Sequence, residues 1–139
     1  MAVNVTRTFD ILDRYIEEFP REDALGGKKD STWYTYSTEA YHKTSHQFAL
    51  GLLALGLTKG DKIATITNNR PEWNFADMGM AMVGVVHVPV YPNISEDEYR
   101  YILSHSEAKI LIAGDKKLFE KLKPVISQIE SLQDTYTFD

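Results

Sequence analysis

The sequence contains no cysteine, so disulfides, thiolate metal sites and a cysteine nucleophile are all excluded. Long apolar runs are also missing: the longest, Met78–Val86, is half of the roughly 18 residues that suggest a membrane span. Basic residues are too few to dominate, since 15 Lys and Arg stand against 20 Asp and Glu for a net charge of −5. No basic cluster is dense enough to follow a phosphate backbone, which makes nucleic acid a poor candidate partner.

The first 19 residues lack the apolar centre of a signal peptide, because charged side chains repeatedly interrupt them. Nothing in the composition indicates an oxidising compartment. The sequence therefore predicts a cytoplasmic protein without a transmembrane segment. Its 139 residues, 43% of them hydrophobic and 12% aromatic, fit one globular domain with a real core.

Two helices around a β-hairpin are expected in the first 55 residues. A stripe of residues three and four apart predicts a helix over 9–19, ended by Pro20. Its members are Phe9, Leu12, Ile16 and Phe19. Residues 24–29 and 32–36 are typical of short strands around Asp30-Ser31. Ser37 can cap a second helix that runs to about Leu55, with Gly56 as its left-handed terminator and an inward stripe. The stripe consists of Tyr41, Ser45, Phe48, Leu52 and Leu55.

From residue 62 onward, strand patterns alternate with helix patterns, which indicates parallel pairing with right-handed crossovers. The expected strands are 62–67, 85–90, 109–113 and 135–138, and the expected helices are 71–83, 95–106 and 115–129. Ser95 with Glu98 makes a capping box, whereas Pro124 should kink or split the last helix. The predicted class is α/β: a mainly parallel sheet covered by helices in three layers, with an N-terminal helix and β-hairpin.

Glycines give no nucleotide site. Gly51 and Gly56 have Walker-like spacing, but Leu57-Thr58 follows where Lys and Ser or Thr would be required, and both glycines belong to a helix or its end. The segment Gly26–Lys29 leads into a hairpin. Gly79 is best explained by close packing of a helix on the sheet, and Gly84 by a helix terminus.

The turn after the first parallel strand is where an open α/β sheet would hold a ligand. Asn68 could cap the following helix or touch a ligand there. Arg70 could contact an anion, although a solvated arginine is the commoner outcome in a loop. Trp73 is expected to be a packing anchor whose indole N–H reaches a backbone acceptor.

Histidines and carboxylates supply no clear chemistry either. Glu39, His42 and His46 project from one side of a helix, but a metal site needs at least three well-placed ligands, so a polar helix edge is favoured. His87 is expected to be a hydrogen-bonded side chain in or near the core, and His105 to end a helix. Acidic pairs and triplets such as Glu17-Glu18 and residues 96–98 fit solvated helix surfaces and caps, and no Gly-x-Ser-x-Gly elbow occurs. We therefore assign no catalytic, cofactor-binding or metal-binding residue.

The order of several short segments resembles the N-terminal part of the AMP-forming acyl-CoA synthetases, an adenylate-forming superfamily, and within it the long-chain fatty acid–CoA ligases. The segments are Leu52–Leu57, Lys59–Ala64, Asn69–Trp73, Gly84–Pro92 and Tyr101–Lys109, with a weaker match over Leu25–Tyr36. Each segment alone is loose, but their ordered spacing is fairly specific.

The resemblance implies a parent ligase that makes an acyl-adenylate from ATP and a fatty acid, then an acyl-CoA thioester, using Mg²⁺ and coenzyme A. The family's phosphate loop, its magnesium Glu, its ribose Asp and its C-terminal lysine do not occur in this sequence. Residues 1–139 are therefore expected to be a partial N-terminal domain that ends before the phosphate loop. We expect it to be inactive alone and to bind none of these cofactors, and the resemblance leaves open a peripheral membrane location for the parent.

Two further expectations follow. The apolar 71–83 helix and unpaired sheet edges predict self-association of the fragment. The alternative to a ligase fragment is a stand-alone α/β ligand-binding or regulatory module that acts near Asn68–Pro71 without catalysis.

Overall fold

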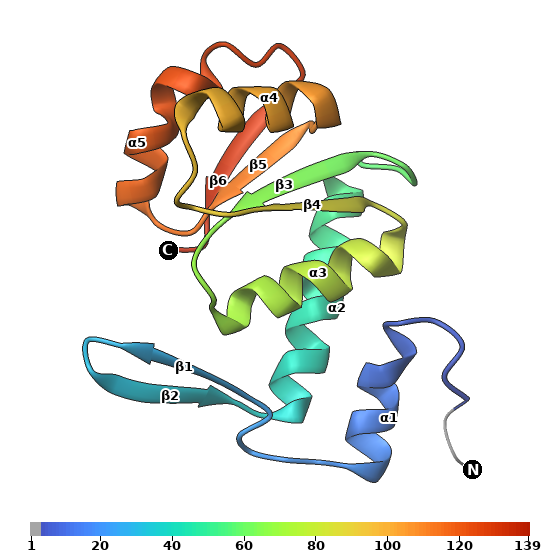
Figure 1. The fold of residues 1–139 in the computed structure, drawn as a ribbon. Coiled ribbons are helices and arrows are strands. Elements are labelled where there is room, and N and C mark those ends of the chain that lie inside the picture. Colours follow the sequence, from blue (N-terminus) through green and yellow to red (C-terminus); the bar gives the residue numbers. More distant parts are fainter. Residues whose placement is uncertain (1–3) are drawn as a thin grey trace. The chain divides into compact units, whose positions relative to one another are not determined.

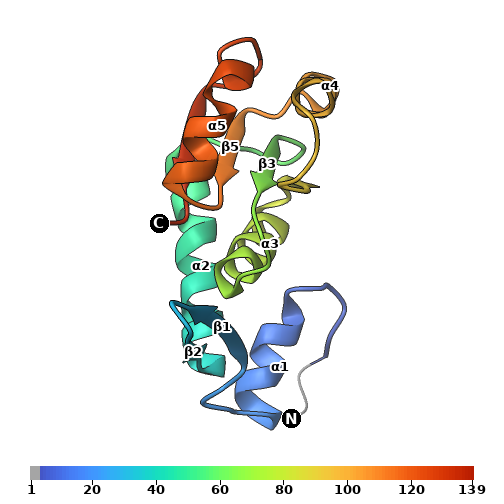
Figure 2. The same cartoon turned by 60° about the vertical axis from the view of Figure 1, so that its left-hand side comes forward.

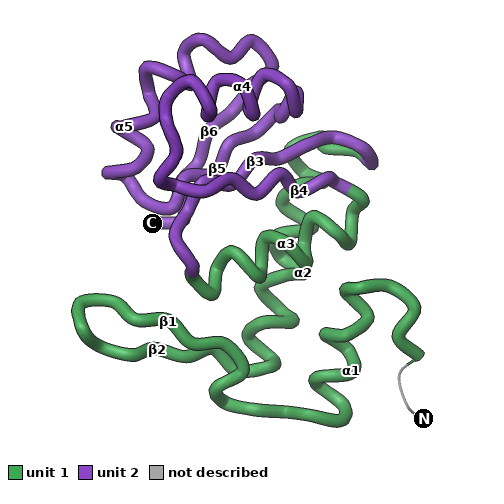
Figure 3. Tube along the Cα trace, in the orientation of Figure 1, with its two compact units in different colours: residues 1–58, 70–84 green, residues 59–69, 85–139 purple. Residues whose placement is uncertain are grey.

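The computed structural model describes residues 4–139, which divide into two compact units (Figures 1 and 3). Unit 1 holds the chain up to Thr58 together with Arg70–Gly84, and unit 2 holds Lys59–Asn69 together with Val85–Asp139.

Unit 1 contains three helices and a β-hairpin. Its elements are α1 (Asp10–Glu18), β1 (Leu25–Lys29), β2 (Thr32–Tyr36), α2 (Thr38–Ala54) and α3 (Pro71–Val83). The hairpin turns at Asp30 and Ser31, whose φ angles of 48° and 67° lie in the left-handed region that two-residue hairpin loops require. Helices α2 and α3 pack on each other (Figure 2), and α1 also packs on α2. The hairpin and both long helices therefore lie where the sequence pattern predicts them.

The apolar stripe of α1 is only partly buried, which differs from what its periodicity suggests. Leu12 is 1% exposed and joins Tyr41 and Phe75 in a small core, but Ile16 is 37% exposed and Phe19 is 54% exposed. Helix α1 packs on α2, and the second half of its stripe is left at the surface. A helical period shows which residues share a face, but it does not show how far a neighbour covers that face.

Two predictions for the long helices need correction. Leu55 is 54% exposed, and Ala49 is buried in its place, because the helix has already ended at Leu55 and the chain turns at Gly56, with φ of 80°. Gly79 packs against a helix and not against the sheet: a β-carbon there would lie 2.8 Å from the Ser45 carbonyl oxygen of α2. By contrast, Gly84 ends α3 with φ of 74°, as predicted, and every residue of α3 is buried or half-buried.

Unit 2 is a four-stranded, fully parallel sheet with strand order β4-β3-β5-β6. The strands are β3 (Lys62–Ile66), β4 (Val86–Val90), β5 (Ile110–Ala113) and β6 (Asp134–Thr137), and the helices are α4 (Glu96–Ser106) and α5 (Lys116–Ile126). Side chains of both helices form one core with the sheet, including Tyr99, Leu103, Leu122 and Val125 over Ala64, Ile66, Leu111 and Ala113. The predicted α/β class, with a parallel sheet flanked by helices, is confirmed.

Local signals in unit 2 have mixed outcomes. The capping box is present, since Ser95 Oγ accepts from the Glu98 N–H at 3.3 Å and Glu98 Oε2 accepts from the Ser95 N–H at 2.8 Å. Pro124 does not split α5, which continues as one helix to Ile126. The helix ends at Ile126, three residues before the predicted boundary. Pro124 therefore lies in the last turn of α5, where little helix remains for it to disrupt.

Candidate functional site

The first candidate site lies in unit 2, at the carboxyl ends of β3 and β5. The chain passes from β3 to its neighbour β4, and then crosses to β5 on the other side of β3, so the strand order reverses at this pair. Open α/β sheets bind ligands at such a switch point. Thr67 and Asn68 follow β3, and Gly114 and Asp115 follow β5.

At the switch point, the residues that follow β3 and β5 make backbone hydrogen bonds and a helix cap with one another or with α5. The Gly114 N–H donates to the Ile66 carbonyl oxygen at 2.8 Å, and a β-carbon at Gly114 would lie 2.5 Å from Thr67 Oγ1. Asp115 accepts from the Leu118 N–H at 2.7 Å and so caps α5. The sequence interpretation did not single out Gly114 as a residue of the switch point. Its position between an apolar strand and a helix-capping aspartate could have indicated it.

The sequence allowed two roles for Asn68, capping α3 or touching a ligand. The first does not occur, because Asn68 does not cap α3. The N-cap residue of α3 is Arg70, and no side chain makes a cap hydrogen bond there. The helix begins with Pro71, which has no N–H to satisfy and already has a helical φ. Helix α3 therefore starts without a capping side chain.

Arg70 belongs to a polar cluster inside unit 1, so the expectation of a solvated arginine is wrong. Its Nε donates to Glu72 Oε2 at 2.7 Å, and both side chains are only 18% exposed. Glu72 Oε1 accepts from the Tyr36 hydroxyl at 2.9 Å, which ties the hairpin to the first turn of α3. The Tyr36 ring also packs edge-to-face on Phe75, with centroids 4.9 Å apart. The arginine thus has a structural partner, while Trp73 nearby is half-buried.

The cluster shifts two proton equilibria. Burial would raise the pKa of Glu72, but the hydrogen bonds from Arg70, the backbone and Tyr36 outweigh it, so the pKa is lowered. Burial first, and then the hydrogen bond to Glu72, raise the pKa of Tyr36 to about 12. The cluster therefore holds an ionised carboxylate and a protonated phenol at neutral pH, which suits a fixed structural contact better than proton transfer.

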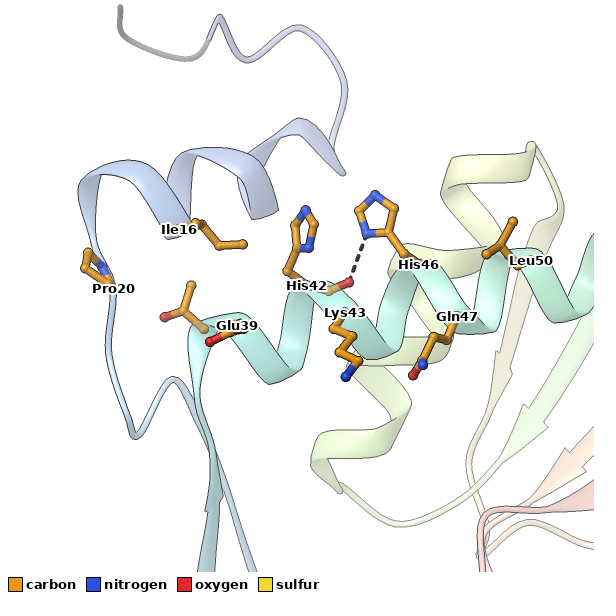
Figure 4. Close-up of a pocket in the computed structure, with 9 residues that line it drawn as sticks. Ile16, Pro20, Glu39, His42, Lys43, His46, Gln47 and Leu50 are labelled. Carbon is orange, nitrogen blue, oxygen red and sulfur yellow. Dashed lines mark hydrogen bonds between the residues drawn. The ribbon is translucent and has the colours of Figure 1, made fainter.

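A second candidate is a groove on unit 1 beside α1 and α2 (Figure 4). It is lined by Ile16, Pro20, Thr38, Glu39, His42, Lys43, His46, Gln47 and Leu50. Glu39, His42 and His46 do share one side of α2, as predicted. His42 Nε2 donates to Asp13 Oδ1 at 2.9 Å, and His46 Nδ1 donates to the His42 carbonyl oxygen at 2.9 Å.

These contacts direct one ring nitrogen of each histidine toward a protein acceptor. The two rings lie 4.2 Å apart and tilted, so they pack on each other rather than converge on one point. Across residues 4–139, no group of three His, Cys, Asp or Glu side chains is placed to hold a metal ion. The groove accordingly offers an amphipathic surface without a described metal centre.

The remaining histidines have local partners. His87 is half-buried, and its Nε2 lies 2.7 Å from Thr65 Oγ1 of the neighbouring strand, as expected for a hydrogen-bonded residue near the core. His105 lies in the last turn of α4, where its ring stacks on Tyr101 with centroids 5.5 Å apart. In the described part of the chain, no helix is both long and apolar enough to cross a membrane.

Comparison with known proteins identifies the family of this chain. Residues 12–139 match the family model described as AMP-binding enzyme, and the chain belongs to that family. The human long-chain-fatty-acid–CoA ligase ACSBG1 is 27% identical over 125 residues, which are 90% of this chain and 17% of that protein. FadD15, a long-chain-fatty-acid–CoA ligase of Mycobacterium bovis, is 33% identical over 84 residues, or 60% of this chain and 14% of that one.

Solved structures show the same fold. The N-terminal domain of FACL13 from Mycobacterium tuberculosis superposes with a TM-score of 0.77 at 24% identity, covering 97% of this chain and 34% of that one. A Rhodopseudomonas palustris protein assigned as a long-chain-fatty-acid CoA ligase gives a TM-score of 0.81 at 22% identity, covering 96% and 33%. The family resemblance inferred from the sequence is confirmed, and the chain spans only 17% of the human relative.

Proposed function

We propose that this chain is the N-terminal structural portion of an ATP-dependent, AMP-forming ligase that joins long-chain fatty acids to coenzyme A. One observation carries the proposal: the family match runs through residues 12–139, while the 125 residues that align with the human long-chain ligase are only 17% of that protein. In a parent enzyme of that kind, these residues would build part of the sheet and brace the acyl and nucleotide sites.

Arg70 and Asp115 do not fit the groups that the family's reaction uses. Arg70 is the cation of the 67–71 loop, and it is paired with Glu72. Asp115, beside the switch point, caps α5. Both side chains are thus engaged in structural contacts, whereas nucleotide binding needs cations and amides directed at phosphate. We therefore assign ATP, Mg²⁺ and coenzyme A to the rest of the parent enzyme and propose that residues 1–139 contribute no catalytic, cofactor or metal ligand.

The isolated chain accordingly has no ligase activity in this proposal. A cytoplasmic location of the parent is proposed on the composition, which contains no cysteine and indicates no oxidising compartment. The fatty acid is proposed as the substrate of the parent, by analogy with the long-chain ligases that match. Acyl chain length is set by residues that line an acyl site, and none of the residues described above is assigned to one.

Fatty-acid-dependent exchange of pyrophosphate into ATP tests the proposal, with the 139-residue chain and the protein from its full reading frame compared side by side. We expect exchange by the longer protein only, and a frame that continues within about 60 residues into a Ser/Thr/Gly-rich loop ending in Lys-Gly. Turnover by the pure 139-residue chain would overturn the assignment, as would a stop codon directly after Asp139.

The alternative, a ligand-binding or regulatory module without catalysis, would use an open site near residues 68–71. The Arg70–Glu72 ion pair supports the ligase-fragment proposal over it, because the cation is already neutralised. Calorimetric titration of the isolated chain with ATP and with a fatty acid separates the two. Saturable binding would favour the module, and a flat titration the fragment.

A further inference from the structure

The turn between β3 and α3, residues 67–70, is fixed at its first end by contacts within unit 2. The Ile66 carbonyl oxygen accepts a hydrogen bond from the Gly114 N–H at 2.8 Å, and the next residue, Thr67, packs directly against Gly114. The Thr67 hydroxyl then donates to the Asn68 carbonyl oxygen at 2.9 Å. The start of the turn is therefore tied to the residue that follows β5.

The other end of the turn is fixed by Arg70. A residue that precedes proline is restricted to extended backbone angles, and Arg70 has φ of −156° and ψ of 150° before Pro71. Its guanidinium is held as well, since Nε donates to Glu72 Oε2 at 2.7 Å and the side chain is only 18% exposed. The two exposed residues between the ends, Asn68 and Asn69, thus belong to a turn that is held on both sides.

The Tyr36 hydroxyl completes the second of these restraints. Arg70 and Glu72 are only two residues apart, so their ion pair alone would let both side chains move together. Tyr36 restrains this movement, because its hydroxyl donates to the second carboxylate oxygen of Glu72 at 2.9 Å. The Tyr36 ring is itself packed edge-to-face on Phe75, with centroids 4.9 Å apart. Strand β2 therefore holds the ion pair through one hydroxyl group, as a packed outer residue holds the side chain in front of it.

We propose that Tyr36 is a positioning residue: through Glu72 and Arg70, it holds the 67–70 turn in the arrangement that the parent ligase needs. The proposal rests on the ligase function proposed above, and it names the contact by which these residues brace a site. The turn follows β3 at the switch point of the sheet, where open α/β sheets bind their ligands. A site that is ordered before its ligand arrives loses no binding free energy to ordering. Tyr36 itself touches no ligand in this arrangement.

A second buried tyrosine supplies a matched control. Tyr41 packs on the same Phe75 ring, with centroids 5.7 Å apart, and is 5% exposed. Within residues 4–139, its hydroxyl makes no hydrogen bond to Glu72 or to Arg70. Tyr36→Phe and Tyr41→Phe therefore each remove one hydroxyl from the same aromatic cluster, but only the first releases Glu72.

The 139-residue chain tests the hold on the turn without any ligase assay. Nitrogen-15 relaxation measures the backbone order parameters of Asn68 and Asn69 and the order of the Arg70 Nε–H group. We expect backbone values near 0.8 in the unaltered chain and in Tyr41→Phe, and a fall toward about 0.6 in Tyr36→Phe, with the values in α5 unchanged. Unchanged order in Tyr36→Phe, or an equal fall in both variants, would overturn the proposal.

The same two variants in the protein from the full reading frame test the link to the reaction. A merely structural loss lowers the fraction of folded enzyme and leaves KM unchanged, whereas a misplaced turn raises KM. Per folded enzyme, we expect Tyr36→Phe to raise the KM of at least one substrate and to lower kcat/KM roughly tenfold, and Tyr41→Phe to stay within about twofold of the unaltered protein. Equal effects of the two variants, or a KM that Tyr36→Phe leaves unchanged, would refute the positioning role.

The two experiments separate the failure of this proposal from the failure of the proposed function. A full-length protein without ligase activity would refute that function, and the role of Tyr36 in the reaction with it. The order parameters of the turn would still show whether Tyr36 holds it. An active full-length protein in which Tyr36→Phe behaves as Tyr41→Phe does would leave the ligase function in place and refute the positioning role alone.

Discussion

Gly79 of α3 lies directly against the Ser45 carbonyl oxygen of α2, so that a β-carbon on Gly79 would come within 2.8 Å of that oxygen. The same carbon would be 3.1 Å from the Ala49 backbone nitrogen. Both neighbours are backbone atoms of a helix, which cannot move aside as a side-chain tip can. The two helices of unit 1 therefore approach each other closely because residue 79 has no side chain.

Replacing this glycine should separate the helices. We expect Gly79→Ala to lower the free energy of unfolding by about 1–3 kcal/mol, the usual cost of overpacking a fixed contact. Urea denaturation followed by circular dichroism measures the change. Gly51→Ala is the matched control, because Gly51 is also inside a helix but has no atom near its missing β-carbon.

The control variant should not lose stability. Alanine is a better helix former than glycine, so Gly51→Ala should leave stability unchanged or raise it by up to about 1 kcal/mol. If both variants lost the same stability, the loss at Gly79 would reflect helix propensity and not a close helix contact.

The Arg70–Glu72–Tyr36 cluster yields a graded prediction. Glu72→Gln leaves a largely buried arginine without its carboxylate, so we expect a loss of about 1–3 kcal/mol in the free energy of unfolding. Tyr36→Phe removes only the hydroxyl and keeps the ring contact with Phe75, so its loss should be smaller, about 0.5–1.5 kcal/mol. The double variant measures the coupling between the two side chains. Strict additivity would contradict the Tyr36–Glu72 hydrogen bond.

This cluster also shows where prediction from the sequence stops. The hairpin, the capping box of Ser95 and Glu98, and the alternation of strands and helices depend on residues close together in the chain, and all were predictable. Glu72 and Tyr36 are 36 residues apart, and no periodicity connects them. Glu72 is only two residues from Arg70, but the sequence does not show that the distant Tyr36 hydroxyl holds its other oxygen, so the loop arginine looked solvated.

The exposure of side chains at the end of α1 could not be predicted from the sequence either. The stripe that contains Leu12 and Ile16 is regular, yet only Leu12 is buried, because burial depends on the neighbour and not on the stripe. The absence of a catalytic residue set was inferred from motifs alone, and it stays a prediction. The family, by contrast, could be inferred from the ordered segments and is confirmed by the match over residues 12–139.

The contact between Gly114 and Thr67 at the switch point can be tested by rescue. A β-carbon on Gly114 would lie 2.5 Å from Thr67 Oγ1 and 3.0 Å from Thr67 Cβ. We expect Gly114→Ala to cost about 1–3 kcal/mol of stability, and part of this cost to disappear in the Thr67→Ala background, where the hydroxyl is gone. Chemical denaturation of the two single variants and the double variant measures it. Equal costs in both backgrounds would place the clash elsewhere.

Asp10 should make stability depend on acidic pH. Its Oδ1 accepts two hydrogen bonds from the Arg7 guanidinium, and its Oδ2 accepts the backbone N–H groups of Thr6 and Arg7. The Arg7 side chain first, and then these backbone donors, hold the pKa of Asp10 far below its ordinary 3.8, although burial opposes the shift. A carboxylate whose pKa is lowered by folding stabilises the protein above the unfolded pKa and loses that contribution as the pH falls below it.

We therefore expect Asp10→Asn to be less stable than the unaltered chain at neutral pH, with the gap narrowing as the pH falls below about 4. Urea titrations at several pH values measure the gap, and the carboxyl carbon shift of Asp10 in NMR spectra reports its pKa directly. Glu130→Gln serves as the control, since Glu130 is exposed and its replacement should leave the pH dependence unchanged. A gap that stayed constant from neutral pH to pH 3 would mean that Asp10 contributes through its shape and not through its charge, because only the charged form is lost by protonation.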